Sequence, residues 1–140
     1  MEIKVGCCGF PTGKKKYFKT FKLVELQSTF YDIPKLESAH RWRKEAPEDF
    51  EFTVKAWQAI SHPSNSPTWR RMKTKIFENE KQNYGFLRPS KQNVEAWNKT
   101  LEVCEALKSQ VCLLQTPPQF NCTKETTPVQ LYKRKHSKHV

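Results

Sequence analysis

The chain has 140 residues, of which 36% are hydrophobic, and 25 Lys and Arg against 14 Asp and Glu give a formal net charge of +11. That length accommodates one domain with its own core, and no apolar run reaches the roughly 20 residues that a membrane-spanning helix needs. No signal peptide precedes the first expected strand, so we expect a soluble, cytoplasmic protein that does not associate with a membrane. The five cysteines are odd in number and lack C-x-x-C spacing, which predicts reduced thiols.

Short apolar runs alternate with helical patterns along the first half of the chain. Gly9 ends the first run, Pro34 closes the loop after the second, and Pro47 ends the helix before the third. Ser38 has a side chain suited to a helix N-cap. We therefore expect strands at 3–8, 22–27 and 50–55, and helices at 14–21 and 38–46.

The second half contains a long irregular stretch, then a helix and a strand. Residues 56–90 hold three prolines and a glycine, with a short helix expected at 66–72. A loop of this length inside a domain is usually functional or partly disordered. Ser90 has the pattern of an N-cap, and apolar spacing predicts an amphipathic helix whose inner face carries Val94, Trp97, Leu101, Cys104 and Leu107. A fourth strand is expected at 110–115, ended by the two prolines that follow.

The alternation of strands and helices predicts an α/β fold. Strands separated by helices form parallel sheets with right-handed crossovers, so we expect four parallel strands in the spatial order 1-2-3-4. The carboxyl ends of such strands lie at one edge of the sheet, and ligands bind there.

Six sequence motifs occur in order along the chain. They are VGCCGF at 5–10, VELQSTFY at 24–31, WRKEAPEDF at 42–50, FTVKA at 52–56, ISHP at 60–63 and LQTPPQF at 114–120. Together they resemble the YecE-like family, known as domain of unknown function 72, in its archaeal branch. The family members are TIM barrels, in which eight βα units take about 250 residues. The resemblance therefore implies a partial barrel of about four βα units, the N-terminal half, and it implies no reaction because the family's activity is not established.

The motifs end at Phe120, and the resemblance is expected to stop there. Residues 121–140 are polar and basic and show no periodicity. We interpret 1–120 as the half-barrel domain and 121–140 as a basic tail that is disordered or read out of frame. A non-functional gene fragment is thus one hypothesis for the chain, and a half barrel with unpaired strand edges is expected to self-associate.

Polar residues at the carboxyl ends of the expected strands form the candidate site. Glu25 and Lys55 are the candidate catalytic residues, for acid–base work on a hydroxylated or phosphorylated small molecule. The candidate ligand-binding residues are Cys8, Gly9, Gln27, Thr29, Tyr31, His62 and Gln115. Two alternatives remain at this point: Glu25 and Lys55 could simply neutralise each other inside the barrel, and His62 could be an ordinary loop histidine.

No metal or cofactor is expected, because the four histidines lack ligand spacing. The basic loop at 57–75, where Trp57 and Trp69 accompany Arg70 and Arg71, supports an alternative function in nucleic-acid binding. We favour a solvated basic surface over that alternative, because the excess positive charge is spread along the chain.

Overall fold

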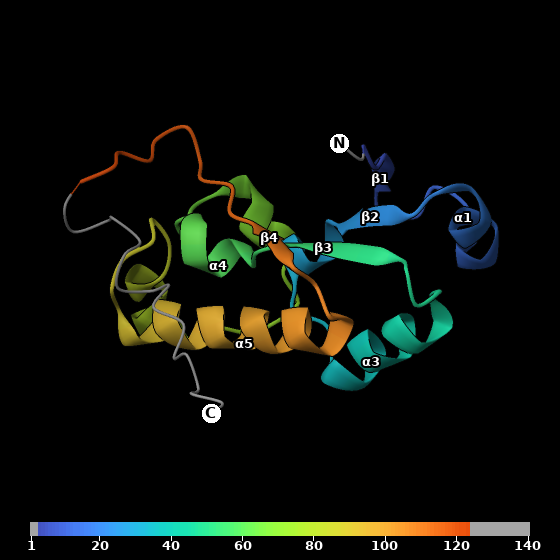
Figure 1. Cartoon of the computed structure of the whole chain (residues 1–140). Coiled ribbons are helices and arrows are strands. Elements are labelled where there is room, and N and C mark those ends of the chain that lie inside the picture. Colours follow the sequence, from blue (N-terminus) through green and yellow to red (C-terminus); the bar gives the residue numbers. More distant parts are fainter. Residues whose placement is uncertain (1–2, 124–140) are drawn as a thin grey trace, which may run out of the picture.

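A computed structural model describes residues 3–123 and shows one parallel sheet with helices packed against it (Figure 1). The strands are β1 Gly6–Cys8, β2 Leu23–Leu26, β3 Glu51–Lys55 and β4 Val111–Leu113. The helices are α1 Lys14–Thr20, α2 Ser28–Tyr31, α3 Leu36–Glu45, α4 Gln58–Ser61 and α5 Lys91–Leu107, with 3₁₀ segments η1 Pro67–Arg71 and η2 Glu78–Asn83. The predictions for the tail at 124–140 lie outside the described residues.

The sheet has the strand order β1-β2-β3-β4, and each neighbouring pair is parallel. One row of the sheet runs from Cys8 through Glu25 and Thr53 to Val111. In the next row toward the carboxyl ends, Lys55 pairs with Leu113. The predicted parallel arrangement and order are therefore confirmed, and the chain folds as an open α/β partial barrel.

The two faces of the sheet have different surroundings. Val24, Leu26, Phe52 and Val54 are all buried, in one core with side chains of α1, α3 and α5. Helices α3 and α5 lie side by side against this face (Figure 1). Alternation along each strand places the row containing Glu25 on the opposite face, which corresponds to the interior of a complete barrel.

Several predicted boundaries differ from the structure. Helix α3 begins at Leu36 and not after Ser38, because the Lys35 carbonyl accepts hydrogen bonds from the N–H groups of Ser38 and Ala39. Ala39 is fully buried, so core packing fixes this first turn. The first strand begins at Gly6, three residues later than predicted, and β4 ends at Leu113.

Helix α5 matches the sequence pattern in all but one position. The Ser90 hydroxyl oxygen accepts a hydrogen bond from the Asn93 N–H at 3.2 Å, so the predicted N-cap is confirmed. Trp97, Cys104 and Leu107 are buried, whereas Val94 is 40% exposed and lies off the inner face.

The stretch 56–90, predicted as mainly irregular, contains α4, η1 and η2. The helix expected at 66–72 is present as the 3₁₀ segment η1. Ala56, Ile60, Trp69 and Leu87 pack with the first half of α5 in a second apolar cluster. No helix among residues 3–123 is long and apolar enough to cross a membrane.

Candidate functional site

Glu25 lies at the centre of one polar cluster on the open face of the sheet. The Gln27 amide donates a hydrogen bond to Glu25 Oε1 at 3.2 Å, and Cys8 Sγ lies 4.0 Å from the same oxygen. The Gly9 N–H donates to the Glu25 carbonyl at 2.8 Å. Gly9 has φ +84°, a conformation that glycine adopts at little cost, so the chain can turn directly after β1. The cluster thus combines a thiol, an amide and a carboxylate at the ends of two adjacent strands.

A second cluster surrounds Lys55 at the end of β3. The Lys55 ammonium lies 4.7 Å from the centroid of the Phe30 ring, in a cation–π contact. Phe30 also packs edge-to-face against the rings of His62 and Tyr31, whose centroids lie 5.0 and 5.2 Å away. Phe30 thus contacts an ammonium and an imidazole that come from β3 and from the loop after it.

His62 is buried, with 7% of its surface exposed. Its Nδ1 lies 2.9 Å from the Ser61 hydroxyl oxygen, in a hydrogen bond that orients the ring. Burial lowers the pKa of His62, and the positive charge of Lys55 lowers it further. The imidazole is therefore neutral at pH 7, because both effects disfavour its protonated form.

Thr29 holds the ends of β2 and β3 together. Its side chain is fully buried, and its hydroxyl lies 2.6 Å from the Leu26 carbonyl and 2.7 Å from the Lys55 carbonyl. A hydroxyl has a single proton to donate, so the two carbonyls compete for it. Thr29 therefore acts here by positioning Lys55.

Tyr31 also belongs to the second cluster, because its ring packs edge-to-face against Phe30 with the centroids 5.2 Å apart, whereas Gln115 lies apart from both clusters. The Tyr31 ring packs against Arg71 of η1, whose guanidinium carbon lies 3.7 Å from the ring centroid. Gln115 is exposed beyond the end of β4, and within residues 3–123 it forms no hydrogen bond with the other candidates. The structure thus brings together Cys8, Gly9, Glu25 and Gln27 in one cluster, and Lys55, His62 and Tyr31 around Phe30 in another.

The predicted ligand site left out several residues that shape this region. Phe30, Ser61 and Arg71 each contact a predicted site residue. Gln58 is fully buried and donates from Nε2 to the Tyr31 carbonyl at 3.1 Å, while its Oε1 and the nearby Trp57 Nε1 are buried without a hydrogen-bond partner among residues 3–123. Ser61 and Phe30 adjoin predicted residues in the sequence, which is the signal that could have indicated them.

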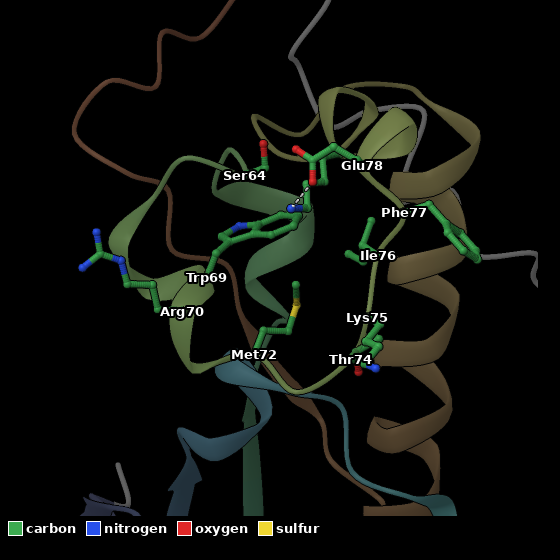
Figure 2. Close-up of a pocket in the computed structure, with 10 residues that line it drawn as sticks. Ser64, Trp69, Arg70, Met72, Thr74, Lys75, Ile76, Phe77 and Glu78 are labelled. Carbon is green, nitrogen blue, oxygen red and sulfur yellow. Dashed lines mark hydrogen bonds and ion pairs between the residues drawn. The ribbon is translucent and has the colours of Figure 1, made fainter.

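A groove of about 720 Å³ lies in the loop after His62 (Figure 2). Trp69, Met72 and Ile76 give it an apolar lining. The Trp69 indole N–H donates to the His62 carbonyl at 3.1 Å, which joins the groove to the candidate site. Figure 2 shows Arg70 and Phe77 directed away from the groove, and the Glu78–Lys81 ion pair, at 2.6 Å, at its rim.

Within residues 3–123, no group of three or more His, Cys, Asp or Glu side chains could hold a metal ion. The two clusters offer chemistry of another kind. A carboxylate, an ammonium and a neutral imidazole lie at the carboxyl ends of adjacent parallel strands, where side chains of α/β proteins bind small molecules.

Comparisons with known proteins agree with the fold. The family model described as "Protein of unknown function DUF72" matches residues 13–138. The chain is similar to the UPF0759 protein YunF of Bacillus subtilis (strain 168), with 30% identity over 110 residues, or 78% of this chain and 33% of YunF. It is also similar to the UPF0759 protein YecE of Escherichia coli (strain K12), with 39% identity over 51 residues, or 36% of this chain and 19% of YecE.

A crystal structure of a DUF72 family protein (EF0366) from Enterococcus faecalis V583 has a similar fold. It shares 26% identity with a TM-score of 0.57, covering 91% of this chain and 44% of the Enterococcus chain. The chain thus spans about a third of the length of YunF and less than half of the solved relative. The archaeal branch is not confirmed, because these relatives are bacterial, and the family match extends past Phe120, where the sequence motifs end.

Proposed function

The chain belongs to the family of proteins of unknown function DUF72, and because that name assigns no activity, we propose a function from the site alone. The proposal is an enzyme site at the carboxyl ends of the strands that acts on a hydroxylated or phosphorylated small molecule. The observation that carries it is the placement of Glu25 and Lys55 on the open face of two adjacent strands. The Gln27 amide binds the Glu25 carboxylate, and the Phe30 ring contacts the Lys55 ammonium. Opposite charges arranged in this way can bind two different groups of one ligand.

Lys55 is the anion-binding residue in this proposal. Among residues 3–123 its ammonium forms no ion pair, and the Phe30 ring restrains it without neutralising it. The Thr29 hydroxyl fixes the Lys55 backbone at the strand end. A phosphate placed above Lys55 would therefore meet an ammonium that is already oriented, which reduces the entropy lost on binding.

Glu25 is the proposed general base and hydroxyl-binding residue. Gln27 engages Oε1 of the carboxylate, which leaves acceptor positions for a substrate hydroxyl. The neutral imidazole of His62 supplies a second hydrogen-bonding group close to Lys55. A carboxylate that removes a proton while an ammonium stabilises the resulting negative charge is an ordinary arrangement for acid–base catalysis.

Ligand binding by single variants tests this proposal. We expect calorimetric titration with glycerol 3-phosphate to show saturable binding that Lys55→Gln weakens at least tenfold, because a charged contact is lost. Lys99→Gln is the matched control, since Lys99 is an exposed lysine on α5 away from the sheet. Equal loss in the two lysine variants would mean that only net charge matters and would refute the site.

Glu25→Gln separates the two proposed roles. It should weaken the binding of glycerol 3-phosphate and leave the binding of inorganic phosphate unchanged, because only the first ligand has alcohol hydroxyl groups that reach from the phosphate to Glu25. Circular dichroism of each variant checks the fold. Loss of folded structure in Glu25→Gln would instead indicate a structural role for the carboxylate.

A second candidate function is the binding of single-stranded nucleic acid by the 57–75 loop. Its support is that this loop contains four Lys and Arg and no Asp or Glu, and that the groove beside it is lined by Trp69. Fluorescence anisotropy with an oligothymidylate at several salt concentrations tests it. Each lost phosphate contact reduces the magnitude of the slope of log affinity against log salt concentration by about 0.7. The double variant Arg70→Gln with Lys75→Gln should therefore reduce that magnitude by about 1.4. Absence of salt-dependent binding would reject this function.

A further inference from the structure

Two cations contact two neighbouring aromatic rings beside the candidate site. Phe30 and Tyr31 are consecutive residues of α2, the short helix that follows β2, and their ring centroids lie 5.2 Å apart. The Lys55 ammonium lies 4.7 Å from the Phe30 centroid. The Arg71 guanidinium carbon lies 3.7 Å from the Tyr31 centroid. The buried Gln58 amide donates to the Tyr31 carbonyl at 3.1 Å, which holds the aromatic pair in place.

Both cations keep their charge in this arrangement. Within residues 3–123, neither Lys55 nor Arg71 forms an ion pair, and a cation–π contact restrains a cation without cancelling its charge. The carboxylate of Asp32, which follows α2, is engaged elsewhere. Its Oδ1 accepts hydrogen bonds from the Thr74 hydroxyl at 2.5 Å and from the Thr74 N–H at 3.4 Å. Two positive charges are therefore present for a ligand.

The chain is anchored on both sides of Arg71. Two residues before it, the buried Trp69 donates from its indole N–H to the His62 carbonyl at 3.1 Å. Three residues after it, Thr74 binds the Asp32 carboxylate. Both anchors hold the segment against residues that adjoin or belong to the candidate site, so Arg71 is fixed relative to that site. The outer strands β1 and β4 make none of these contacts.

The contact with Tyr31 suits a guanidinium that binds a carboxylate. A guanidinium carbon 3.7 Å from a ring centroid lies against the face of that ring. The N–H groups of a guanidinium lie around its edge, where a carboxylate can accept two of them at once. Arg71 is exposed, so a ligand can reach this edge. The Lys55 ammonium is instead a compact charge with three donors, which suits a phosphate.

We propose that Arg71 is a second anion-binding residue of the candidate site and that the ligand is a phosphorylated hydroxy acid. This inference rests on the proposed function, in which Lys55 binds a phosphate and Glu25 binds a hydroxyl. Arg71 adds a carboxylate to these two groups. Side chains from β2, β3 and η1 would then each bind one group of the same small molecule.

Calorimetric titration of the full chain with 3-phosphoglycerate and with glycerol 3-phosphate tests the proposal. Both ligands have a phosphate and a secondary hydroxyl, but the first has a carboxylate where the second has a CH₂OH group. We expect the wild-type chain to bind 3-phosphoglycerate at least tenfold more tightly. Arg71→Gln should remove this preference and leave the affinity for glycerol 3-phosphate largely unchanged, because only the contact with the carboxylate is lost.

Arg70→Gln is the matched control. Arg70 adjoins Arg71 in η1 and is also exposed, but it points away from the groove beside it (Figure 2). This variant loses the same charge and should keep the preference. Arg71→Lys keeps the charge without the planar guanidinium and should lose most of the preference. Circular dichroism checks each variant, and Arg71→Lys replaces Arg71→Gln if the latter does not fold.

Three results would overturn the proposal while the proposed function stands. The first is equal affinity of the wild-type chain for the two ligands. The second is equal loss of the preference in Arg70→Gln and Arg71→Gln, because net charge alone would then explain it. The third is equal weakening of both ligands by Arg71→Gln, which would show that Arg71 shapes the site without binding the carboxylate. A wild-type chain that binds neither ligand would refute the proposed function together with this inference.

Discussion

Replacement of Thr29 by valine removes one hydroxyl and keeps the shape of the side chain. That hydroxyl is fully buried and lies within 2.7 Å of the carbonyls of Leu26 and Lys55. Loss of a hydrogen bond costs about 0.5–1.5 kcal/mol, and a buried acceptor left without its donor raises the cost to about 1–3 kcal/mol. We therefore expect Thr29→Val to lower the free energy of unfolding by about 2 kcal/mol, since two acceptors share the hydroxyl.

Thr100→Val is the matched control for this change. Thr100 is also fully buried, and its hydroxyl donates to the Ala96 carbonyl at 3.0 Å. That bond lies within one turn of α5 and does not connect two secondary-structure elements. Its loss should therefore lower the free energy of unfolding by no more than about 1 kcal/mol. Urea denaturation of both variants, with midpoints and slopes compared, measures the difference. A Thr29→Val chain as stable as wild type, or less affected than Thr100→Val, would refute the assigned role.

Two further predictions concern the loop after β3. Gly85 has φ +82°, and a Cβ at this position would lie 2.7 Å from the His62 carbonyl. Gly85→Ala should therefore lower the free energy of unfolding by clearly more than the roughly 1 kcal/mol expected for Gly9→Ala. Gly9 has φ +84° with open space around it, so urea midpoints that fall equally would contradict the steric argument. The lowered pKa of His62 means that the unfolded chain binds its proton more readily, so stability should fall as pH drops below about 6.5. His62→Gln should flatten that dependence and the exposed His40→Gln should not; a curve unchanged by His62→Gln would contradict the assignment.

The strands could be predicted from the sequence because their burial alternates in a simple way. Val24 and Leu26 face the core while Glu25 lies on the other face, and Phe52, Val54 and Lys55 follow the same rule. Alternation of this kind depends only on residues within one strand. It was sufficient to place Glu25 and Lys55 on the same side of adjacent strands, as their register requires.

The surroundings of those side chains could not be predicted in the same way. Helix α4 has four residues and the 3₁₀ segments have five and six, too few for a periodic pattern. The contact between Tyr31 and Arg71 joins residues 40 positions apart and depends on the path of the intervening chain. No local pattern encodes that path, so the sequence could indicate candidate site residues but not most of the side chains that contact them.

The loop that carries His62 is fixed by backbone contacts at the end of α4. The N–H groups of residues 85, 86 and 87 donate to the carbonyls of Ala59, Ser61 and Ile60 at 2.8, 3.0 and 2.9 Å. These are the carbonyls that a helix end leaves without partners. To make these bonds, Phe86 and Leu87 adopt left-handed conformations with φ of +53° and +54°.

Left-handed backbone costs a non-glycine residue about 1–2 kcal/mol, so the surrounding contacts must offset this strain. Leu87 is buried in the second apolar cluster, and the buried Asn93 side chain binds the Gly85 N–H and the carbonyls of Gly85 and Arg88. The strained turn thereby joins α4 to the beginning of α5, and His62 directly follows α4. The orientation of His62 toward Phe30 thus depends on residues more than 20 positions away, which explains why the sequence could indicate this histidine but not its role.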